Sequence, residues 1–390
     1  MDRRNVCIFS ANYYPFLGGV EIFTKNLSSA LVQEGCSVTV VTNNATGLPL
    51  HEVTLEGIEI YRLPCLPVLR GRMPIPLKNA AWHDAVHTIM ERHWDCILVN
   101  TRFYLHSLLG LRVAENQHLT PIVCEHGSAY LSMGNRFADV FVRLWEHIVT
   151  AAVKRYKPAF CAVSQKAADW LSTFGISCDT VLSNSIDAVA YRKSSSGRNF
   201  REELGLADDD FIVCFVGRFV PEKGVTKLVE AMESIKDPEV KLILAGDGPL
   251  RGKVDSCAGN SIFNVGRLQS ADVAALMLQS NLLCLPTRSE GFCTTLLESA
   301  ACSLPALITP VGGTDELIPS SEYGTLLPAD CTPSTIASEI RHLHQRPDLL
   351  ELQGQNVHNL VERDYSWQRT ACTLMDINRS AQQRDKQRDK

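Results

Sequence analysis

FIVCFVGRFVPEKG, at residues 211–224, is the stretch that decides the fold. Its first six residues, Phe211 to Val216, form a continuous apolar run with the length and composition of a buried parallel strand. Gly217 then begins a loop that carries Arg218 and Lys223. Ligands of open α/β sheets bind outside the carboxyl ends of the strands. This stretch therefore predicts a parallel sheet with a cationic loop at its binding edge.

Comparable apolar runs alternate with amphipathic stretches along the rest of the chain, which is typical of parallel sheets covered by helices. In the first half we expect strands at Val6 to Ser10, Ser37 to Thr42, Asp95 to Asn100, Pro121 to Glu125 and Ala159 to Val163. In the second half we expect further strands at Val240 to Ala245, Ser261 to Val265, Leu282 to Pro286 and Ala306 to Thr309. Helices are predicted at Glu21 to Gln33 and Arg136 to Tyr156, the second with an apolar face of Phe137, Phe141, Leu144, Ile148 and Ala152.

The chain length and the two series of strands predict two domains, because 390 residues are too many for one hydrophobic core. We expect the first domain at 1–190 and the second at 201–364. The serine-rich segment between them, 191–200, lacks periodicity and is the expected linker. The tail 381–390 repeats Gln-Arg-Asp-Lys without apolar anchors, so we expect it to be disordered.

Composition narrows the class of protein. A formal net charge of -5 argues against broad electrostatic binding to nucleic acid. The 14 cysteines are spread along the chain, several of them in apolar runs, and they lack zinc-ligand spacing, which indicates reduced, buried side chains and a cytoplasmic protein. No stretch approaches the ~20 apolar residues that span a bilayer. We therefore expect a cytoplasmic protein, or one at the inner face of a membrane.

The cationic loop is suited to a pyrophosphate. Arg218 can give phosphate oxygens a bidentate fork, and Lys223 adds a compact point charge. A solvated turn is the alternative. Gly18 and Gly19 follow the first strand and precede a helix, where backbone N–H groups can approach an anion closely. A simple tight turn would also explain this glycine pair.

A second constellation, EGFCTTLLE at residues 290–298, follows the strand Leu282 to Pro286. We expect the helix to begin near Phe292 or Cys293, with Glu290 on the loop before it and Glu298 about two turns in. Two carboxylates would then lie beside a helix start that also attracts phosphate. An ordinary helix with a favourably placed glutamate is the alternative interpretation.

Taken together, the ordered motifs resemble glycosyltransferase family four, over nearly the whole chain up to about Asp376. The series is Gly18-Gly19-Val20-Glu21, Glu125-His126-Gly127, Val163-Ser164, Asn184 to Asp187, Gly217-Arg218, Glu222-Lys223-Gly224, Gly246 to Pro249, Val265-Gly266 and Glu290 to Glu298. The resemblance implies the GT-B fold, in which two Rossmann-like domains have parallel sheets facing across a cleft. It also implies that residues 365–380, starting with Tyr365-Ser366-Trp367, form a helix crossing back to the first domain.

The resemblance implies a role for each matching residue. Arg218 and Lys223 would bind the donor diphosphate, Glu290 the hydroxyls of the donor sugar and Glu298 the ribose. His126 would face the sugar from the first domain, and Gly19, beside Gly18, would close over the diphosphate. Backbone at Val265 and Gly266 would recognise the base, and N–H groups from Phe292 to Thr295, after Gly291, would meet the sugar and the distal phosphate. His126 could instead be a structural histidine after a strand.

The activity implied is retaining, nucleotide-sugar-dependent hexosyl transfer to a saccharide or lipid-linked acceptor, in cell-surface polysaccharide, lipopolysaccharide or glycolipid assembly. The family is thought to retain configuration by same-face attack assisted by the departing phosphate. Asp208 to Asp210 precede a strand and indicate a solvated turn, so we expect no metal and no cofactor. A sugar-nucleotide 2-epimerase of the same fold and a non-catalytic nucleotide-sugar-binding module are the alternatives.

The acceptor side is where the resemblance ends. Relatives differ most in the segment from Pro64 to Lys78 and near Arg136, and Cys293 and Thr294 stand where many have glycine, proline or leucine. The acceptor-side candidates are Arg70, Arg72, Lys78 and Arg136. With Arg143, Lys154, Arg155 and Lys157, these cations could approach anionic lipid as a peripheral membrane contact. A normal solvated helix face is the alternative.

Overall fold

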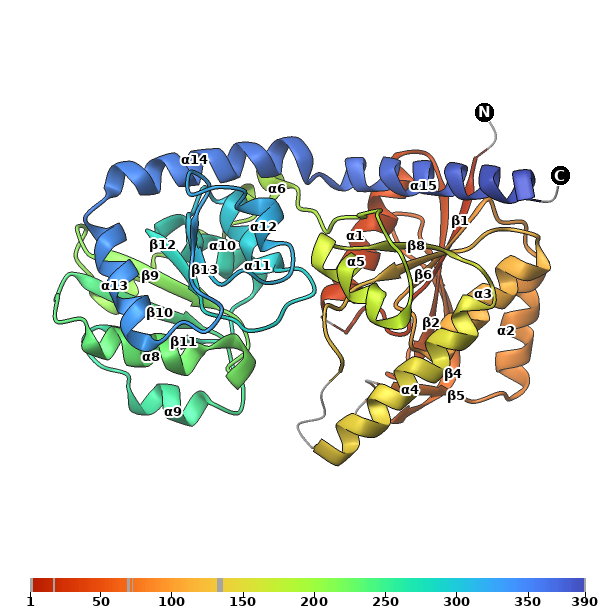
Figure 1. Cartoon of the computed structure of the whole chain (residues 1–390), viewed down its shortest axis with the longest axis horizontal. Helices are drawn as coiled ribbons and strands as arrows, with labels where there is room; N and C mark the ends of the chain where they lie inside the picture. The colour runs from red at the N-terminus through yellow and green to blue at the C-terminus, as the bar shows by residue number, and fades with distance from the viewer. Residues whose placement is uncertain (1–2, 17, 69–70, 72, 132–135, 389–390) are drawn as a thin grey trace. The chain divides into compact units, whose positions relative to one another are not determined.

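The computed structural model describes residues 3–16, 18–68, 71, 73–131 and 136–388 of the chain. These residues form two compact α/β units, each with its own sheet (Figure 1). Unit 1 comprises residues 1–184 and 367–390, and unit 2 comprises residues 185–366. The chain therefore leaves unit 1 after Asn184 and returns to it at Trp367.

The sheet of unit 1 has the order β3-β4-β2-β1-β6-β7-β8, with β5 paired to β4. The strands are β1 (Asn5–Phe9), β2 (Ser37–Asn44), β3 (His51–Val53), β4 (Glu59–Val68), β5 (Met73–Pro76), β6 (Cys96–Asn100), β7 (Ile122–Glu125) and β8 (Ala159–Ala162). All pairs are parallel except those that β3 and β5 make with β4. The carboxyl ends of β1, β6 and β7 thus meet at one edge, where parallel sheets carry their ligands.

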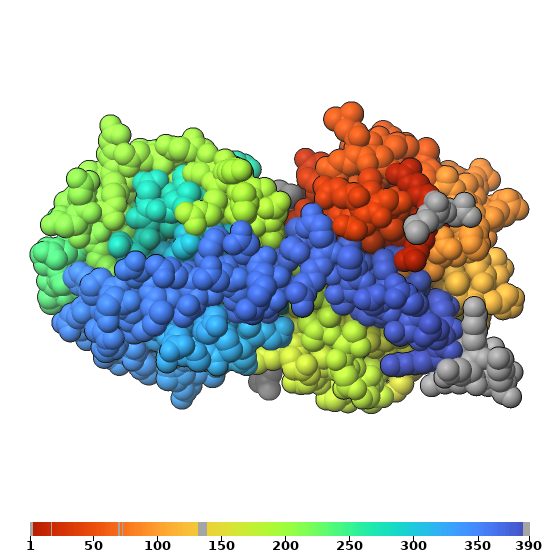
Figure 2. Space-filling view, turned by 90° about the horizontal axis from the view of Figure 1, so that it is seen from above, coloured from red at the N-terminus to blue at the C-terminus, as the bar shows by residue number. Residues whose placement is uncertain are grey.

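Helices cover both faces of this sheet, as parallel strands require. They are α1 (Gly19–Gln33), α2 (Ala80–Glu91), α3 (Leu105–Asn116), α4 (Arg136–Lys154), α5 (Gln165–Leu171), the short 3-10 turn η1 (Ser172–Phe174) and α15 (Trp367–Arg388). One face packs Phe9, Val99 and Val123 of the sheet against α3 and α4 in a fully apolar core. Helix α15, dark blue in Figure 2, lies on the outside of unit 1 and packs against α1.

The sheet of unit 2 is entirely parallel, in the order β11-β10-β9-β12-β13-β14. Its strands are β9 (Phe211–Val216), β10 (Val240–Ala245), β11 (Ile262–Gly266), β12 (Leu282–Leu285), β13 (Ala306–Ile308) and β14 (Thr325–Leu326). Its helices are α6 (Ala188–Lys193), α7 (Phe200–Leu204), η2 (Pro221–Lys223), α8 (Val225–Ser234), α9 (Arg251–Ser256), α10 (Ser270–Gln279), α11 (Thr294–Ala301), α12 (Thr314–Leu317), α13 (Pro333–His344) and α14 (Pro347–Asp364). The continuous apolar run of β9 is buried at the centre of this sheet, as its composition predicts.

The cysteines pack as small apolar side chains, since twelve of the fourteen are buried and all fourteen are free thiols. Burial raises the pKa of Cys214 to about 12, so its thiol stays protonated. Among the described residues, no helix is both long and apolar enough to cross a membrane.

The predicted linker at 191–200 is wrong, because these residues lie inside unit 2. Phe200 is fully buried there, and the backbone N–H of Ser196 donates to the carbonyl of Ala271 at 3.0 Å. The loss of periodicity marks a loop between α6 and α7, which packing has fixed to α10.

The prediction that the chain is disordered from residue 381 is also wrong up to Arg388, because α15 continues to that residue. Ala381 is buried, and the Gln382 side chain bonds the backbone of Thr120 in both directions at 3.0 Å. These two contacts extend the helix along unit 1 beyond the point where apolar periodicity ends.

The apolar face predicted on α4 exists, but its described large side chains do not join the core. Phe141 is 73% exposed, and Leu144 and Ile148 are each 57% exposed. The buried face of α4 is instead formed by Glu146, Val149, Thr150 and Val153. Helical spacing identified an apolar stripe correctly but could not say which stripe faces the sheet.

Candidate active site

In unit 2, glycines let the cationic loop after β9 lie against its neighbours. A Cβ on Gly246 would stand 1.9 Å from the carbonyl oxygen of Gly217, and one on Gly224 would stand 2.1 Å from that of Pro286. Gly224 also has a φ of +70°, a left-handed conformation that favours glycine. The loop after β9 is thereby fixed between the ends of β10 and β12.

The fixed loop brings Lys223 to Glu290, and their side chains form an ion pair. Both side chains are largely buried, at 21% and 15% exposure. The Arg288 N–H donates to the Glu222 carbonyl at 2.8 Å, which ties the two loops together by their backbones. Arg218 lies exposed on the same loop. The structure therefore brings three of the predicted catalytic residues to the carboxyl ends of β9 and β12.

A glycine pair that the sequence analysis missed, Gly312 and Gly313, supports the Glu290 loop. Their φ angles are +31° and +73°, and a Cβ on Gly312 would stand 2.3 Å from the Glu290 carbonyl oxygen. A Cβ on Gly313 would meet the Phe292 ring at 2.8 Å. Adjacent glycines between a strand and the next helix, the signal used for Gly18 and Gly19, would have identified this pair.

Helix α11 begins at Thr294, one residue beyond the predicted start. The Cys293 N–H donates to the Gly312 carbonyl at 3.2 Å, and the Thr294 N–H lies 3.1 Å from the Phe292 carbonyl. These two amides are therefore engaged within the chain, although the resemblance implied that they meet the sugar and phosphate. Gly291 and Thr295 are partly exposed beside them.

Glu298 lies on α11, and burial raises its pKa to about 7. Burial also raises the pKa of the Cys293 thiol to about 12; the charges of Glu290 and Glu298 add to this rise, and that of Lys223 opposes it. Glu298 is a carboxyl poised to titrate near neutral pH, and it would ionise more readily once hydroxyl donors reach it.

Val265 and Gly266 end β11 at the same edge of the sheet. Gly266 has a φ of +70° and donates its N–H to the Asn264 side chain at 3.0 Å, while its carbonyl accepts from Gly246 at 2.8 Å. Both residues are partly exposed. The N–H and carbonyl of Gly266 are thus both engaged within unit 2, and recognition of a base by this segment stays a prediction.

In unit 1, Gly18 and Gly19 form the N-terminus of α1, with Gly18 as the residue before the helix. The carboxylate of Glu21 lies beside Gly18 at the start of this helix. Burial raises the pKa of Glu21, while hydrogen bonds from the backbone of Glu21 and Gly18 lower it in part. A carboxylate therefore occupies a position where the sequence predicts an anion.

His126 follows β7, and its Nε2 lies 3.0 Å from Oδ1 of Asn100 at the end of β6. Its ring packs edge-on to Phe23, with the ring centroids 4.8 Å apart. Burial lowers the pKa of His126 to about 3, so the imidazole is neutral at physiological pH. The contact with Asn100 is compatible both with the sugar-facing role implied by the resemblance and with a structural histidine.

The loop carrying His126 is held by a buried triad that the sequence analysis also missed. Arg102 is 1% exposed and pairs with both Glu125 and Glu146, at 1% and 2% exposure. Glu125 accepts the N–H groups of His126 and Gly127 at 3.1 and 2.9 Å, and Glu146 accepts that of Leu131 at 3.1 Å. These residues are too far apart in sequence for any local signal to group them.

Among the acceptor-side candidates, Lys78 is exposed with its ammonium 5.7 Å from the centroid of Trp82. Arg136 is the first residue of α4. Arg70 and Arg72 lie outside the described residues.

Asp208 and Asp209 are exposed, while Asp210 accepts the Ala207 N–H at 2.8 Å, so the three aspartates form a turn. In the described part of the chain, no cluster of His, Cys, Asp and Glu side chains could hold a metal ion.

Two Rossmann-like units, with ligand-binding loops at the carboxyl ends of their strands, define the GT-B class of protein. Residues 17–189 match the model of Glycosyltransferase Family 4, and residues 197–359 match that of Glycosyl transferases group 1. An uncharacterized glycosyltransferase of Methanocaldococcus jannaschii, MJ1178, is 34% identical over 92% of this chain and 93% of its own. The chain belongs to the family-four glycosyltransferases, and it is a transferase.

Two further relatives extend the comparison. A human protein that is one subunit of phosphatidylinositol N-acetylglucosaminyltransferase is 23% identical over 94% of this chain and 74% of its own. The Anabaena protein HepE, solved in complex with UDP-glucose, superimposes with a TM-score of 0.72 at 17% identity, covering 96% of this chain and 99% of its own. The predicted family and fold class are confirmed.

Proposed function

We propose that this glycosyltransferase moves a hexosyl sugar from a nucleoside diphosphate to a saccharide or lipid-linked acceptor, with retention of configuration and without a metal. The observation that carries the proposal is the Lys223–Glu290 ion pair beside the exposed Arg218. This arrangement places two cations suited to a diphosphate beside a carboxylate suited to sugar hydroxyls. The HepE complex with UDP-glucose is consistent with such a donor.

Charge development explains why the cations are needed. As the bond from the anomeric carbon to the diphosphate breaks, negative charge grows on the distal phosphate. Arg218 and Lys223 stabilise that charge, and they are held in place by backbone contacts before the substrate arrives. Glu298 accepts hydrogen bonds from the ribose hydroxyls, and Glu290 accepts them from the hydroxyls of the donor sugar. With two fixed cations at the leaving group, no divalent ion is required.

The test is to incubate the purified chain with UDP-, GDP- and ADP-sugars and to follow nucleoside diphosphate release, with and without excess chelator. We expect one donor class to be hydrolysed slowly without any acceptor, and chelator to leave the rate unchanged. Loss of activity in chelator would contradict metal-independent transfer. Conversion to another sugar nucleotide would favour a 2-epimerase, and binding without turnover would favour a non-catalytic module.

For the acceptor, we propose a lipid-linked substrate reached at the surface of an anionic bilayer, as in glycolipid or cell-surface polysaccharide assembly. The exposed stripe of α4 supports this, because its Phe141, Leu144 and Ile148 lie beside Met73 of β5 and line an apolar pocket of about 390 Å³ with Val142 and Trp145. The human relative is named for phosphatidylinositol, a lipid. Large exposed apolar patches on soluble folds mark interaction surfaces.

The β4–β5 hairpin enlarges this apolar surface. Leu66 pairs directly with Ile75, and they are 48% and 44% exposed. Two exposed cations belong to the same elements: Lys78 follows the hairpin, and Arg143 is on α4. In a chain of net charge -5, exposed cations on the elements that carry an apolar face complement an anionic bilayer.

We expect the protein to float with anionic liposomes at low salt, and a Phe141→Glu/Leu144→Glu variant to lose most of that binding. Burying two carboxylates in the acyl region is unfavourable, and the new charges repel the anionic headgroups. Leu352→Glu is the matched control, since Leu352 is 42% exposed on α14 of unit 2. If the wild-type chain stays unbound at low salt, direct membrane contact is excluded.

A further inference from the structure

A buried chain of hydrogen bonds links helix α1 to the ring of His126 within unit 1. The Thr24 hydroxyl lies 2.7 Å from the carbonyl oxygen of Val20. Nδ2 of Asn100 lies 2.8 Å from that hydroxyl, and Oδ1 of Asn100 lies 3.0 Å from Nε2 of His126. Thr24 is fully buried and Asn100 is 1% exposed, so water does not compete for these contacts.

The chemistry of each group determines which atom donates and which accepts in this series of hydrogen bonds. A carbonyl oxygen only accepts, so the single hydroxyl hydrogen of Thr24 points to Val20. The Ser10 hydroxyl is a poorer partner for it, at 3.4 Å, and donates its own hydrogen to the Asn12 carbonyl at 2.8 Å. The Thr24 oxygen must therefore accept from the amide nitrogen of Asn100. The amide oxygen then faces His126, and it can only accept a hydrogen from Nε2.

We propose that Asn100 is a positioning residue that holds His126 as the tautomer protonated on Nε2, leaving Nδ1 as the ring nitrogen that receives the substrate. In the described part of the chain, no hydrogen bond reaches Nδ1 of His126. The ring is neutral, because burial keeps its pKa near 3, so Nδ1 carries a lone pair.

The consequence rests on the proposed function. If His126 faces the donor sugar, Nδ1 accepts a hydrogen bond from a sugar hydroxyl and cannot donate one. Because the chain of bonds begins at the first turn of α1, it also ties the ring to the helix that carries Gly18 and Gly19. The same contacts would then fix the position of His126 relative to Gly18 and Gly19.

The tautomer can be measured without any substrate. The full-length protein is labelled with 15N-histidine, and the two ring nitrogens of His126 are read by long-range 1H–15N correlation at neutral pH, assigned with a His126→Gln variant. We expect a single Nε2-protonated ring in the wild type. Asn100→Asp keeps an acceptor and should retain that tautomer, whereas the isosteric Asn100→Leu should give an exchanging mixture. Asn43→Leu, which removes a buried amide at the end of β2, should leave His126 unchanged.

Activity provides the second readout. We expect Asn100→Leu to lower donor turnover about tenfold, as for one misplaced hydrogen bond, and Asn100→Asp to restore part of it. A His126 ring protonated on Nδ1, or one unaffected by Asn100→Leu, overturns the proposal. Full turnover by a mixed-tautomer Asn100→Leu protein overturns its catalytic half. If the wild type turns over no donor, the proposed function fails, while the spectra still decide the tautomer.

Discussion

Lys223→Ala is expected to lose roughly a thousandfold in kcat/KM for the nucleoside diphosphate sugar. The substitution removes a cation from the leaving diphosphate. It also leaves Glu290, only 15% exposed, without the cation that offsets its charge beside the arriving phosphates. Arg218→Ala should lose less, about a hundredfold, because the exposed Arg218 leaves no buried carboxylate behind. Both losses are measured as nucleoside diphosphate release over a range of donor concentrations.

Matched controls separate this effect from a general loss of charge. Lys227→Ala removes a lysine of α8 whose ammonium donates to the Cys331 carbonyl at 2.6 Å and should keep turnover within about twofold. In the double variant Lys223→Ala/Glu290→Ala, the penalties should be less than additive, since each single change breaks the same pair. Strict additivity would mean that the two residues act independently, and near-normal turnover by Lys223→Ala would remove the site.

The strands at the centre of both sheets could be predicted from the sequence, because a parallel strand buried on both faces must be a continuous apolar run. Phe211–Val216 and Val240–Ala245 have the bounds expected. The β4–β5 hairpin was not predicted, since Pro64, Pro67 and Pro74 interrupt its pattern. Pro74 is tolerated because it lies on β5, an edge strand that pairs with β4.

The charged residues of the candidate site in unit 2 could also be predicted from the sequence, because Arg218, Lys223 and Glu290 lie on loops that follow strands. The contact between the two loops could not be predicted. That Lys223 meets Glu290 depends on the left-handed Gly224 and its close approach to Pro286, which are properties of the folded sheet. The Arg102 triad has the same origin: its members come from the ends of β6 and β7 and from the inner face of α4, and only the order of strands brings them together.

Arg102→Met is expected to destabilise unit 1 by about 3–5 kcal/mol, because it leaves two carboxylates buried without their cation. Arg102 also stacks on Phe174 at 3.8 Å, a contact that methionine replaces only in part. All five tryptophans belong to unit 1, so tryptophan fluorescence in urea follows this unit alone. Adding Glu125→Gln and Glu146→Gln should recover much of the loss, since the amides keep their acceptor oxygens.

The pH dependence of this loss has a definite sign. Burial raises the pKa of Glu146 in the folded chain, while Leu131 and Arg102 lower it, so removing Arg102 must raise it further. A carboxyl with a raised folded pKa gives stability that is fully present below its unfolded pKa and is lost as the pH rises through the folded value. The deficit of Arg102→Met should therefore be smaller at about pH 5 than at about pH 8.

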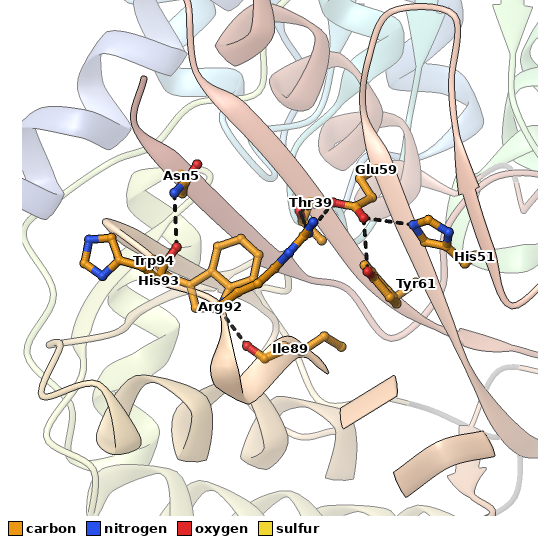
Figure 3. A network of polar contacts seen from close by, with 9 residues as sticks. All are labelled: Asn5, Thr39, His51, Glu59, Tyr61, Ile89, Arg92, His93 and Trp94. Carbon is orange, nitrogen blue, oxygen red and sulfur yellow. Dashed lines mark hydrogen bonds and ion pairs between the residues drawn. The ribbon is translucent and has the colours of Figure 1, made fainter. Parts of the chain in front are cut away.

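Arg92→Met provides the exposed counterpart. Figure 3 shows the Arg92 guanidinium beside the Glu59 carboxylate, which also binds His51 and Tyr61 at 2.8 and 3.0 Å. The Arg92 side chain is 41% exposed, and Glu59 keeps its contacts with His51 and Tyr61 after the substitution, so the cost should stay below about 1 kcal/mol. Equal losses for the two variants would show that burying the two carboxylates of the Arg102 triad adds no cost beyond that of a partly exposed pair.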